Sequence, residues 1–244
     1  MNETAQMWME ISFNVLYLVV VWWLVAAMLR RLPQVAAAEQ KIGRYFIWAF
    51  GLLALGDTGH VGFRVLAYAM GGLESSLNLG GLEIGLVGLG ALSTAITVTF
   101  FYVLVLFIWQ ERYNQPLGWF GWLLIISAGV RLVVMALPGN QWNSVVPPQP
   151  ISLVRNLFLT ISGLGVAYLI LRDAAKAGDR VFTWIGVSIL VSYAFYIPVI
   201  LFVQVAPLVG MLMIPKTLAY VAIAIIAYQN LFQKQEQVQL TASG

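Results

Sequence analysis

The sequence has no cysteine and a single histidine, His60, among its 244 residues. Disulfide bonds and thiolate sites are therefore excluded. One histidine cannot build a multi-histidine zinc site or a bis-histidine haem site, so we expect no metal and no cofactor of these kinds. Charged residues are also scarce, at 9% of the chain. Any chemistry must come from a few carboxylates, arginines, lysines and hydroxyls and from this one imidazole.

Apolar residues are abundant instead. They make up 61% of the chain, against about 45–50% in a soluble domain, and the mean hydropathy is +0.86. A membrane-spanning helix needs about 20 mostly apolar residues. Seven such segments occur, at 11–29, 45–70, 82–109, 117–137, 151–171, 181–204 and 208–231. The sequence predicts an all-α integral membrane protein: one seven-helix transmembrane bundle over residues 1–235, followed by a short tail at 236–244.

Basic residues gather in alternate connections between these segments. They are Arg30, Arg31, Lys41, Arg44, Arg112, Arg172, Lys176, Arg180 and, after the last helix, Lys234. The opposite connections, "GGLESSLNLGG", "PGNQWNSVVPPQP" and "QVAP", contain no lysine or arginine. The positive-inside rule predicts an external N-terminus and a cytoplasmic C-terminus. The same basic flanks explain the pI near 9.2 and favour contact with anionic membrane lipid, whereas nothing indicates nucleic acid.

Four further basic residues lie inside the predicted helices. They are Arg64, Arg131, Arg155 and Lys216. A charge at membrane depth costs about 2.5–3.5 kcal/mol on insertion scales, so such residues normally face a protein interior or a wet cavity and have partners. They are the first candidates for a functional site.

The depth of each ionisable residue follows from a rise of about 1.5 Å per helical residue. Counted in this way, Asp57 and Lys216 lie near the middle of the membrane, with His60 about 4–5 Å beyond Asp57. Arg64, Glu83, Arg131 and Arg155 form a second layer near the outer boundary. We therefore expect Asp57, His60 and Lys216 to lie beneath an anion-binding layer of arginines.

The stretch "GDTGHVGFR", residues 56–64, places Asp57, His60 and Arg64 on one side of a helix. Its glycines leave a flat surface where a neighbouring helix can approach closely. We interpret this stretch as one wall of an outward-facing polar pocket, with Lys216 on the opposite wall. Pro215 predicts a local break in which the lysine ammonium finds backbone oxygens.

Tyrosines and hydroxyls extend this interpretation. Tyr193 and Tyr196 precede Pro198 in the sixth helix and are predicted to hydrogen-bond into the same cavity. The hydroxyl groups of Ser93, Thr94, Thr97 and Thr99 in the third helix either satisfy backbone carbonyls of their own helix or line a polar path, and we favour the first, a packing role.

Structural explanations stay open beside the functional ones. An Asp57–Lys216 pair would fix how the second and seventh helices pack, without binding anything. Arg131 and Arg155 would reach outer headgroups as snorkelling side chains. His60 would be a hydrogen-bonded core residue.

Two resemblances bear on these residues. The motifs Gly56-Asp57-x-x-His60-x-x-x-Arg64 and "MLMIPKT", residues 211–217, are similar to those of a group of uncharacterised bacterial seven-helix membrane proteins. This resemblance implies the bacterial cytoplasmic (inner) membrane and no known activity. The seven helices, Lys216 in the last of them and the aromatic, proline-containing sixth helix also resemble microbial rhodopsins, which would make Lys216 the attachment point of retinal. The middle of the third helix, however, lacks the carboxylate of that class.

The leading hypothesis is a pocket that binds a phosphate or carboxylate group of a lipid or small amphiphile. Arg64, Glu83, Arg131, Arg155, Tyr193 and Tyr196 are the predicted ligand-binding residues. Asp57, His60 and Lys216 would act as catalytic residues if the bound group is processed, with Asp57 as the base; whether the chain is an enzyme stays open. Two alternatives remain, a retinal-binding photoreceptor or pump and a proton-coupled transporter that uses Asp57 and Lys216. The oligomeric state is left open.

Overall fold

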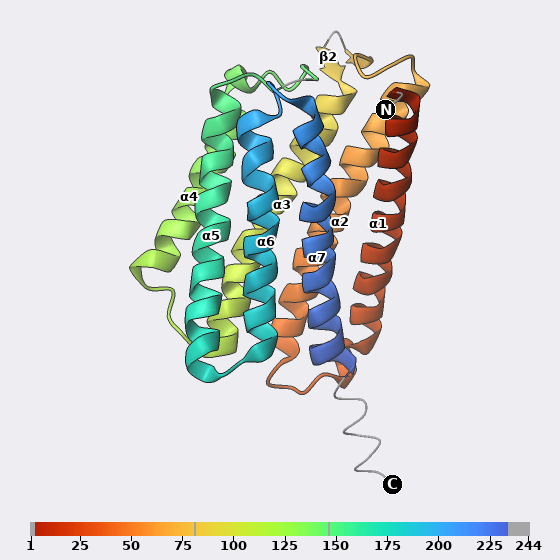
Figure 1. Ribbon diagram of the computed structural model, residues 1–244. Helices are drawn as coiled ribbons and strands as arrows, with labels where there is room; N and C mark the ends of the chain where they lie inside the picture. Colours follow the sequence, from red (N-terminus) through yellow and green to blue (C-terminus); the bar gives the residue numbers. More distant parts are fainter. Residues whose placement is uncertain (1–2, 81, 146, 234–244) are drawn as a thin grey trace.

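The computed structural model describes residues 3–80, 82–145 and 147–233, and it consists almost entirely of helices (Figure 1). The seven long helices are α1 (Glu3–Arg31), α2 (Gln40–Ala69), α3 (Leu86–Tyr113), α4 (Gly118–Ala136), α5 (Ile151–Ala177), α6 (Arg180–Phe202) and α7 (Met213–Ala227). With its short flanking helices, α7 forms an apolar stretch over Leu208–Gln233, so seven helical segments are long and apolar enough to cross a membrane. The prediction of an all-α chain with the helices of a multi-pass membrane protein is confirmed.

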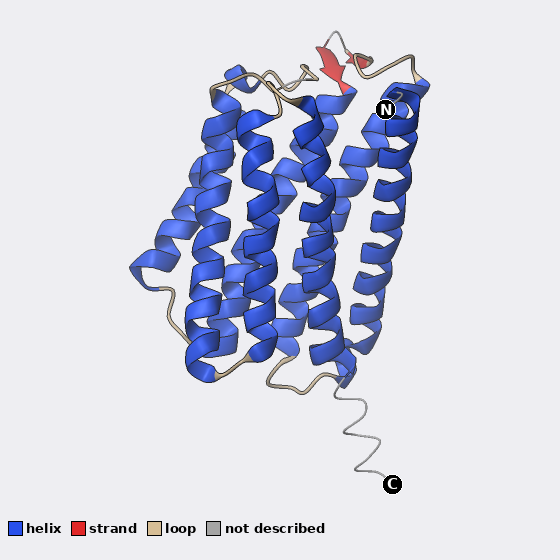
Figure 2. Ribbon diagram, in the orientation of Figure 1, coloured by secondary structure: helices blue, strands red, loops and turns tan. Residues whose placement is uncertain are grey.

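Short elements connect and extend these helices. They are η1 (Leu32–Gln34), η2 (Pro138–Asn140) and η3 (Pro207–Leu212), the π-helix η4 (Tyr228–Gln233) and the strands β1 (Ser76–Leu79) and β2 (Leu82–Gly85). The two strands form an antiparallel hairpin at one end of the bundle (Figure 2). This hairpin was not predicted, and the helix expected from residue 82 begins only at Leu86.

Asn143, in the connection between α4 and α5, explains where the hairpin ends. Its side-chain oxygen accepts a hydrogen bond from the Gly85 backbone N–H at 3.1 Å, and its amide donates to the Glu83 carbonyl at 2.9 Å. The Asn143 side-chain amide thus bonds the two β2 backbone groups that a neighbouring third strand would otherwise bond. The backbone at Gly85 is extended and α3 starts immediately after it.

Glycines allow α2 and α3 to approach closely. A Cβ atom at Gly56 would lie 1.8 Å from Thr97 Oγ1, and one at Gly59 would lie 2.6 Å from Ser93 Oγ. The predicted close approach is therefore confirmed for these two positions. It is wrong for Gly62, where an added Cβ would meet nothing within 4 Å.

The basic connections all lie at one end of the bundle, which we call the basic end, and the hairpin lies at the other, the hairpin end (Figure 1). Ion pairs join helices at the basic end. Lys41 pairs with Glu111 at 2.5 Å, and Arg112 contacts both Glu39 at 2.8 Å and Asp179 at 2.9 Å. Lys234 and the predicted tail at 236–244 lie outside the described residues. The two ends therefore differ in charge as the sequence predicts, and the side of the membrane that each faces stays a prediction.

An aromatic core fills the bundle between the two ends. Five aromatic rings form a row in the order Tyr220, Phe101, Phe50, Phe46 and Phe182. The distances between successive ring centroids are 5.3, 5.5, 6.4 and 6.4 Å. All five side chains are buried. The row runs from the middle of α7 to the first turn of α6, at the basic end.

Candidate functional site

A cavity of about 530 Å³ lies among the helices in the half of the bundle nearer the hairpin end. Lys216 is in the first turn of α7 and Arg155 is in the second turn of α5, and both helices begin at that end. The predicted site residues that line the cavity are Asp57, His60, Arg64, Arg131, Arg155, Tyr196 and Lys216. The structure therefore brings seven of the predicted residues together, whereas Glu83 and Tyr193 lie outside the lining.

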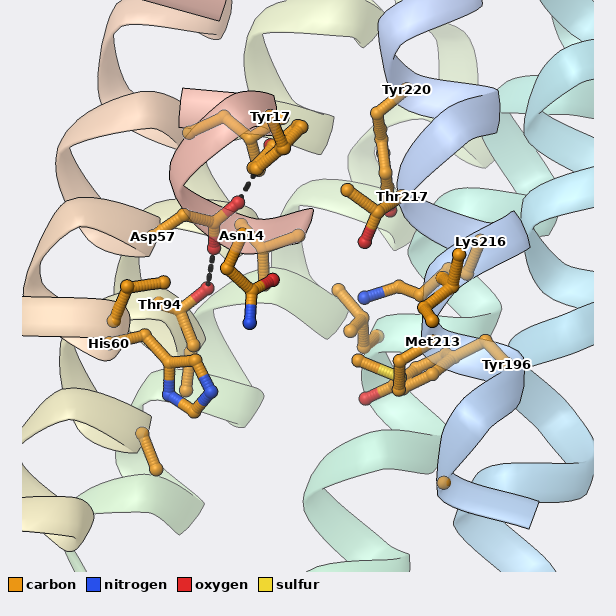
Figure 3. A pocket seen from close by; sticks show the side chains of 18 of the residues that line it. Asn14, Tyr17, Asp57, His60, Thr94, Tyr196, Met213, Lys216, Thr217 and Tyr220 are labelled. Atoms are coloured by element: carbon orange, nitrogen blue, oxygen red, sulfur yellow. Dashed lines mark hydrogen bonds between the residues drawn. The ribbon is translucent and has the colours of Figure 1, made fainter. Parts of the chain in front are cut away.

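Asp57 is held on one wall by two hydroxyl groups (Figure 3). Tyr17, from α1, donates to Asp57 Oδ2 at 2.8 Å, and Thr94, from α3, donates to Oδ1 at 2.6 Å. The interpretation of Thr94 as a packing residue that bonds its own helix is wrong. These two bonds fix the carboxylate between three helices, so its position depends on α1 and α3 as well as on α2.

Lys216 projects from the opposite wall (Figure 3). Its Nζ lies 4.6 Å from the ring centroid of Tyr196 and 5.5 Å from that of Tyr220, which are distances of cation–π contacts. In the described part of the chain no carboxylate lies within 4.0 Å of this ammonium, and it donates no hydrogen bond to a backbone oxygen. The direct Asp57–Lys216 pair and the predicted backbone partners near Pro215 are therefore absent among these residues.

Arg131, from α4, is 2% exposed. Its Nε donates to the Arg155 carbonyl at 3.2 Å and its Nη1 donates to the Ala95 carbonyl at 2.7 Å and to the Thr99 hydroxyl. Within the described ranges Nη2 has no hydrogen-bond partner. All these partners are neutral, so the guanidinium is positioned by hydrogen bonds that leave its charge uncompensated.

Arg155, from α5, is likewise buried, with 6% of its surface exposed. Its Nη1 donates to Asn140 Oδ1 at 3.0 Å, and the guanidinium lies over the Trp142 ring with its carbon 4.3 Å from the centroid. Its Nε and Nη2 make no hydrogen bond to a described residue. The alternative in which Arg131 and Arg155 snorkel to outer headgroups is wrong, because snorkelling side chains expose their charged ends.

His60 also lines the cavity, one turn from Asp57. Its Nδ1 atom is buried and has no hydrogen-bond partner among the described residues. Its backbone is close to α3, since a Cβ added to Gly90 would lie 3.0 Å from His60 Cα. The alternative in which His60 is a fully hydrogen-bonded core residue is therefore wrong for its Nδ1 atom. His60 and Asp57 do not bond to each other, so no acid–base dyad is formed.

The two predicted residues outside the lining have other roles. Glu83 lies in β2, is exposed, and accepts a hydrogen bond from the Ser76 hydroxyl at 2.6 Å. Tyr193 is buried, and its hydroxyl donates to the Leu159 carbonyl at 2.8 Å. Tyr193 packs against Gly163, where an added Cβ would lie 2.0 Å from the phenol oxygen. Glu83 was expected in the third helix and lies in the hairpin instead, whereas Tyr193 lies in α6 as expected but is directed at α5 rather than into the cavity.

Neutral polar residues of the cavity were missed by sequence reasoning. They include Asn14, Tyr17, Asn156 and Tyr220. Asn156 Oδ1 accepts a hydrogen bond from the Tyr196 hydroxyl at 3.1 Å, and the hydroxyls of Tyr220 and Tyr102 are 2.7 Å apart. A signal existed for Tyr220, which follows Lys216 by four residues and so shares its helix face. Tyr17 gave none, because tyrosine is common in apolar helices.

The donor set of the cavity suits an anion. Lys216, Arg131 and Arg155 supply charged N–H donors, which bind carboxylate and phosphate oxygens more strongly than neutral donors do. No group of three or more His, Cys, Asp or Glu side chains that could hold a metal ion occurs in residues 3–80, 82–145 and 147–233. Comparisons with protein-family models, with curated proteins and with solved structures found no match to this chain.

Proposed function

We propose that the cavity binds an anionic group, phosphate or carboxylate, of a lipid or small amphiphile. One observation carries this proposal: Lys216, Arg131 and Arg155 line one cavity, and among the described residues none of them has a carboxylate within 4.0 Å. Buried charges in proteins are normally paired, because an unpaired charge in a weakly polar interior is costly. A bound anion would supply the missing compensation.

The basic end of the same molecule provides the contrast. There Lys41, Arg112 and Arg172 each contact a carboxylate at 2.5–2.9 Å, although these side chains are 30–59% exposed. Several cations are thus paired where water could already stabilise them. Buried Arg131 and Arg155 and half-buried Lys216, nearer the hairpin end, lack such partners, which supports a ligand rather than a structural role.

The neutral lining supports an amphiphile. Apolar side chains stand beside the cationic ones, among them Phe13, Val98, Leu159, Met213 and Ile214. Ligand sites of several hundred cubic ångströms that combine apolar walls with a few polar groups are typical of small organic molecules. The cavity would hold a charged head against the arginines and lysine and an apolar portion against these residues.

Two other functions have less support. The row of packed rings from Tyr220 to Phe182 lies between the cavity and the basic end, which favours a pocket that opens at one end over a transport path. Retinal bound to Lys216 as a protonated Schiff base would need a nearby counterion. Asp57 is the available carboxylate, and it is held by Tyr17 and Thr94 on the opposite wall.

Asp57 and His60 face the space in which a bound head would lie (Figure 3). Since they do not hydrogen-bond to each other, we propose binding and assign no reaction. We further propose that the protein lies in a bacterial inner membrane with the hairpin end outside, as the distribution of basic residues favours.

Native mass spectrometry on protein purified in mild detergent tests the proposal. We expect a co-purifying anionic lipid or metabolite that is retained in Arg44→Gln, a charge removal at the exposed basic end, and depleted in Lys216→Met. An absorption spectrum with added retinal is recorded on the same samples. A visible band that disappears in Lys216→Met, or equal anion occupancy in all variants, would contradict the proposal.

A further inference from the structure

We infer that the group bound in this cavity is a phosphomonoester, in preference to a carboxylate or a phosphodiester. The inference rests on the proposed function, because it names the chemistry of the same site. It follows from the number of cations that face the cavity, from the donors they leave free and from the place of the one carboxylate in the lining.

The charge balance comes first. Among the cations of the cavity lining, Lys216, Arg131 and Arg155 have no carboxylate within 4.0 Å in the described residues, and the acidic residue of the lining is Asp57. The formal charges of these four residues sum to +2. Arg64 also lines the cavity and has an interaction partner; with its charge included the sum is +3, so a dianion balances the lining better than a monoanion in either case. A carboxylate or a phosphodiester carries one negative charge, whereas a phosphomonoester carries about −1.5 to −2 near neutral pH and nearly cancels the charge of the first four residues.

The free donors match the same group. Arg131 keeps Nη2, Arg155 keeps Nε and Nη2, and Lys216 keeps its whole ammonium, none of them bonded to a described residue. Three separate cationic side chains thus offer N–H groups. A phosphomonoester presents three terminal oxygens, one for each cation. A carboxylate or a phosphodiester presents two, so two of the three cations would have to share one oxygen.

The three cations line one cavity, and contacts between neighbouring groups link the helices that carry them. Arg131 Nε donates to the Arg155 carbonyl at 3.2 Å, which ties α4 to α5 at this level. Lys216 lies against the Tyr196 ring, and the Tyr196 hydroxyl bonds Asn156, the residue after Arg155. Three mutually repelling cations around one cavity are stabilised most by a multiply charged anion.

The opposite wall fixes where the rest of the ligand lies. Asp57 repels a phosphate, and His60 Nδ1 is an unbonded polar atom beside it. The phosphate would therefore sit against α4, α5 and α7. The part of the head that carries hydroxyl groups would face Asp57 and His60, which can accept hydrogen bonds.

Lipids and soluble molecules both carry phosphomonoesters, and a titration separates the two sources. The purified protein is titrated with dioleoyl phosphatidate, with dioleoyl phosphatidylglycerol as the diester of matched chains, with oleate as the carboxylate and with glycerol 3-phosphate as the soluble monoester. We expect phosphatidate to bind at least about 10-fold more tightly than phosphatidylglycerol or oleate, since its additional negative charge strengthens the hydrogen bonds from the three cations. Binding of glycerol 3-phosphate with similar affinity would assign a soluble phosphomonoester.

The pH dependence gives a second readout. The second ionisation of a phosphomonoester has a pKa near 6. Affinity for phosphatidate should therefore rise as the pH goes from about 5 to about 7.5, while affinity for phosphatidylglycerol should not. Protonation of His60 at low pH would act in the opposite direction on both lipids, and the His60→Gln variant removes that contribution.

The outcomes separate this inference from the proposed function. Equal affinities for phosphatidate, phosphatidylglycerol and oleate, all weakened in Lys216→Met, would keep an anion site and overturn the phosphomonoester. Affinities for every probe that are unchanged in Lys216→Met and in Arg155→Gln would overturn both. Arg155→Gln serves as a second, independent variant in case Lys216→Met misfolds. Its side-chain amide can still donate a hydrogen bond to Asn140, so its fold should be kept.

Discussion

At the scale of single residues, the site is defined by cations whose partners are neutral. The Lys216 ammonium lies against two tyrosine rings, and the Arg131 and Arg155 guanidiniums are positioned by carbonyl, hydroxyl and amide oxygens. These contacts set the geometry of the charges without cancelling them. Each cation should therefore matter more for binding than for folding.

Lys216→Met tests this separation. The substitution removes the charge and keeps the side-chain length, and no ion pair with a described residue is broken. Replacing a buried charge with an apolar side chain of similar size is often neutral or stabilising. We expect the apparent unfolding temperature in detergent to stay within about 4 °C of wild type or to rise. Affinity for phosphatidate should fall about 10-fold to 100-fold. A protein that no longer folds would show that Lys216 has a structural role.

Asp57→Asn gives a prediction of opposite sign. The carboxylate is the negative charge of the cavity lining, so its removal should strengthen phosphatidate binding by a few-fold, as a titration of the variant against wild type would measure. The asparagine oxygen would accept a hydrogen bond from one of the two hydroxyls, Tyr17 or Thr94, and the asparagine NH2 group would donate to the oxygen of the other. Weaker binding in this variant would mean that Asp57 contacts a donor or cation of the ligand. If the chain proves to have hydrolytic activity, Asp57→Asn should abolish turnover while binding is kept.

At the scale of elements, the contact between α2 and α3 positions Asp57 and His60. Gly56 and Gly59 bring α2 against Thr97 and Ser93, and the neighbouring Thr94 then reaches Asp57 at 2.6 Å. A small residue is needed at both positions because α3 occupies the space of a side chain. The polar wall of the cavity thus depends on two glycines that touch no ligand.

A pair of alanine substitutions on α2 tests this dependence. In Gly56→Ala the new methyl would lie 1.8 Å from Thr97 Oγ1 and 3.1 Å from the Thr94 Cα, so the two helices must separate. Overpacking of this kind costs about 1–3 kcal/mol, which corresponds to a fall of roughly 2–12 °C in unfolding temperature. Gly62→Ala is the matched control and should be neutral or slightly stabilising, because alanine is the better helix former. Equal unfolding temperatures for the two variants would contradict the close contact between α2 and α3 at Gly56.

The same elements show how far the sequence predicts the fold. The seven helices were predictable because each needs a long apolar run, and the bilayer leaves few other structures for such a run. The β1–β2 hairpin was not predictable, because strands of four residues show little hydrophobic periodicity. It is also held by a tertiary hydrogen bond to Asn143, which lies 58 residues beyond Gly85 in the sequence.

The site was predictable to the extent that charge marks it. Buried arginines and a lysine are costly in a membrane helix, so each draws notice in the sequence. Tyr17 and Asn14 carry no such cost, and their place beside Asp57 depends on how α1 packs against α2. Glu83 misled the prediction because the start of α3 is set by a tertiary contact.

At the scale of the whole molecule, the two ends of the bundle differ in charge and in how that charge is compensated. Ion pairs between helices occur at the basic end, whereas Arg131, Arg155 and Lys216, nearer the hairpin end, have no carboxylate within 4.0 Å among the described residues. We propose from the positive-inside rule that the basic end faces the cytoplasm, which would make the cavity face outward.

The absence of cysteine allows a clean test of this orientation. Single cysteines are introduced as Glu74→Cys, at the hairpin end, and Lys176→Cys, at the basic end; both positions are exposed. We expect a membrane-impermeant maleimide to label Glu74→Cys in intact spheroplasts, and to label Lys176→Cys only after the membrane is permeabilised. The reverse pattern would place the cavity on the cytoplasmic side.

The most direct test of the central claim is an experimental structure with a tetrahedral dianion in the cavity. Crystals of the purified protein soaked in tungstate give an anomalous signal that locates the anion without assumptions about its identity. We expect a peak between the Lys216 ammonium and the guanidiniums of Arg131 and Arg155. The peak should be absent in Lys216→Met and present in Arg44→Gln. Anomalous peaks confined to the exposed arginines of the basic end, with an empty cavity, would contradict it.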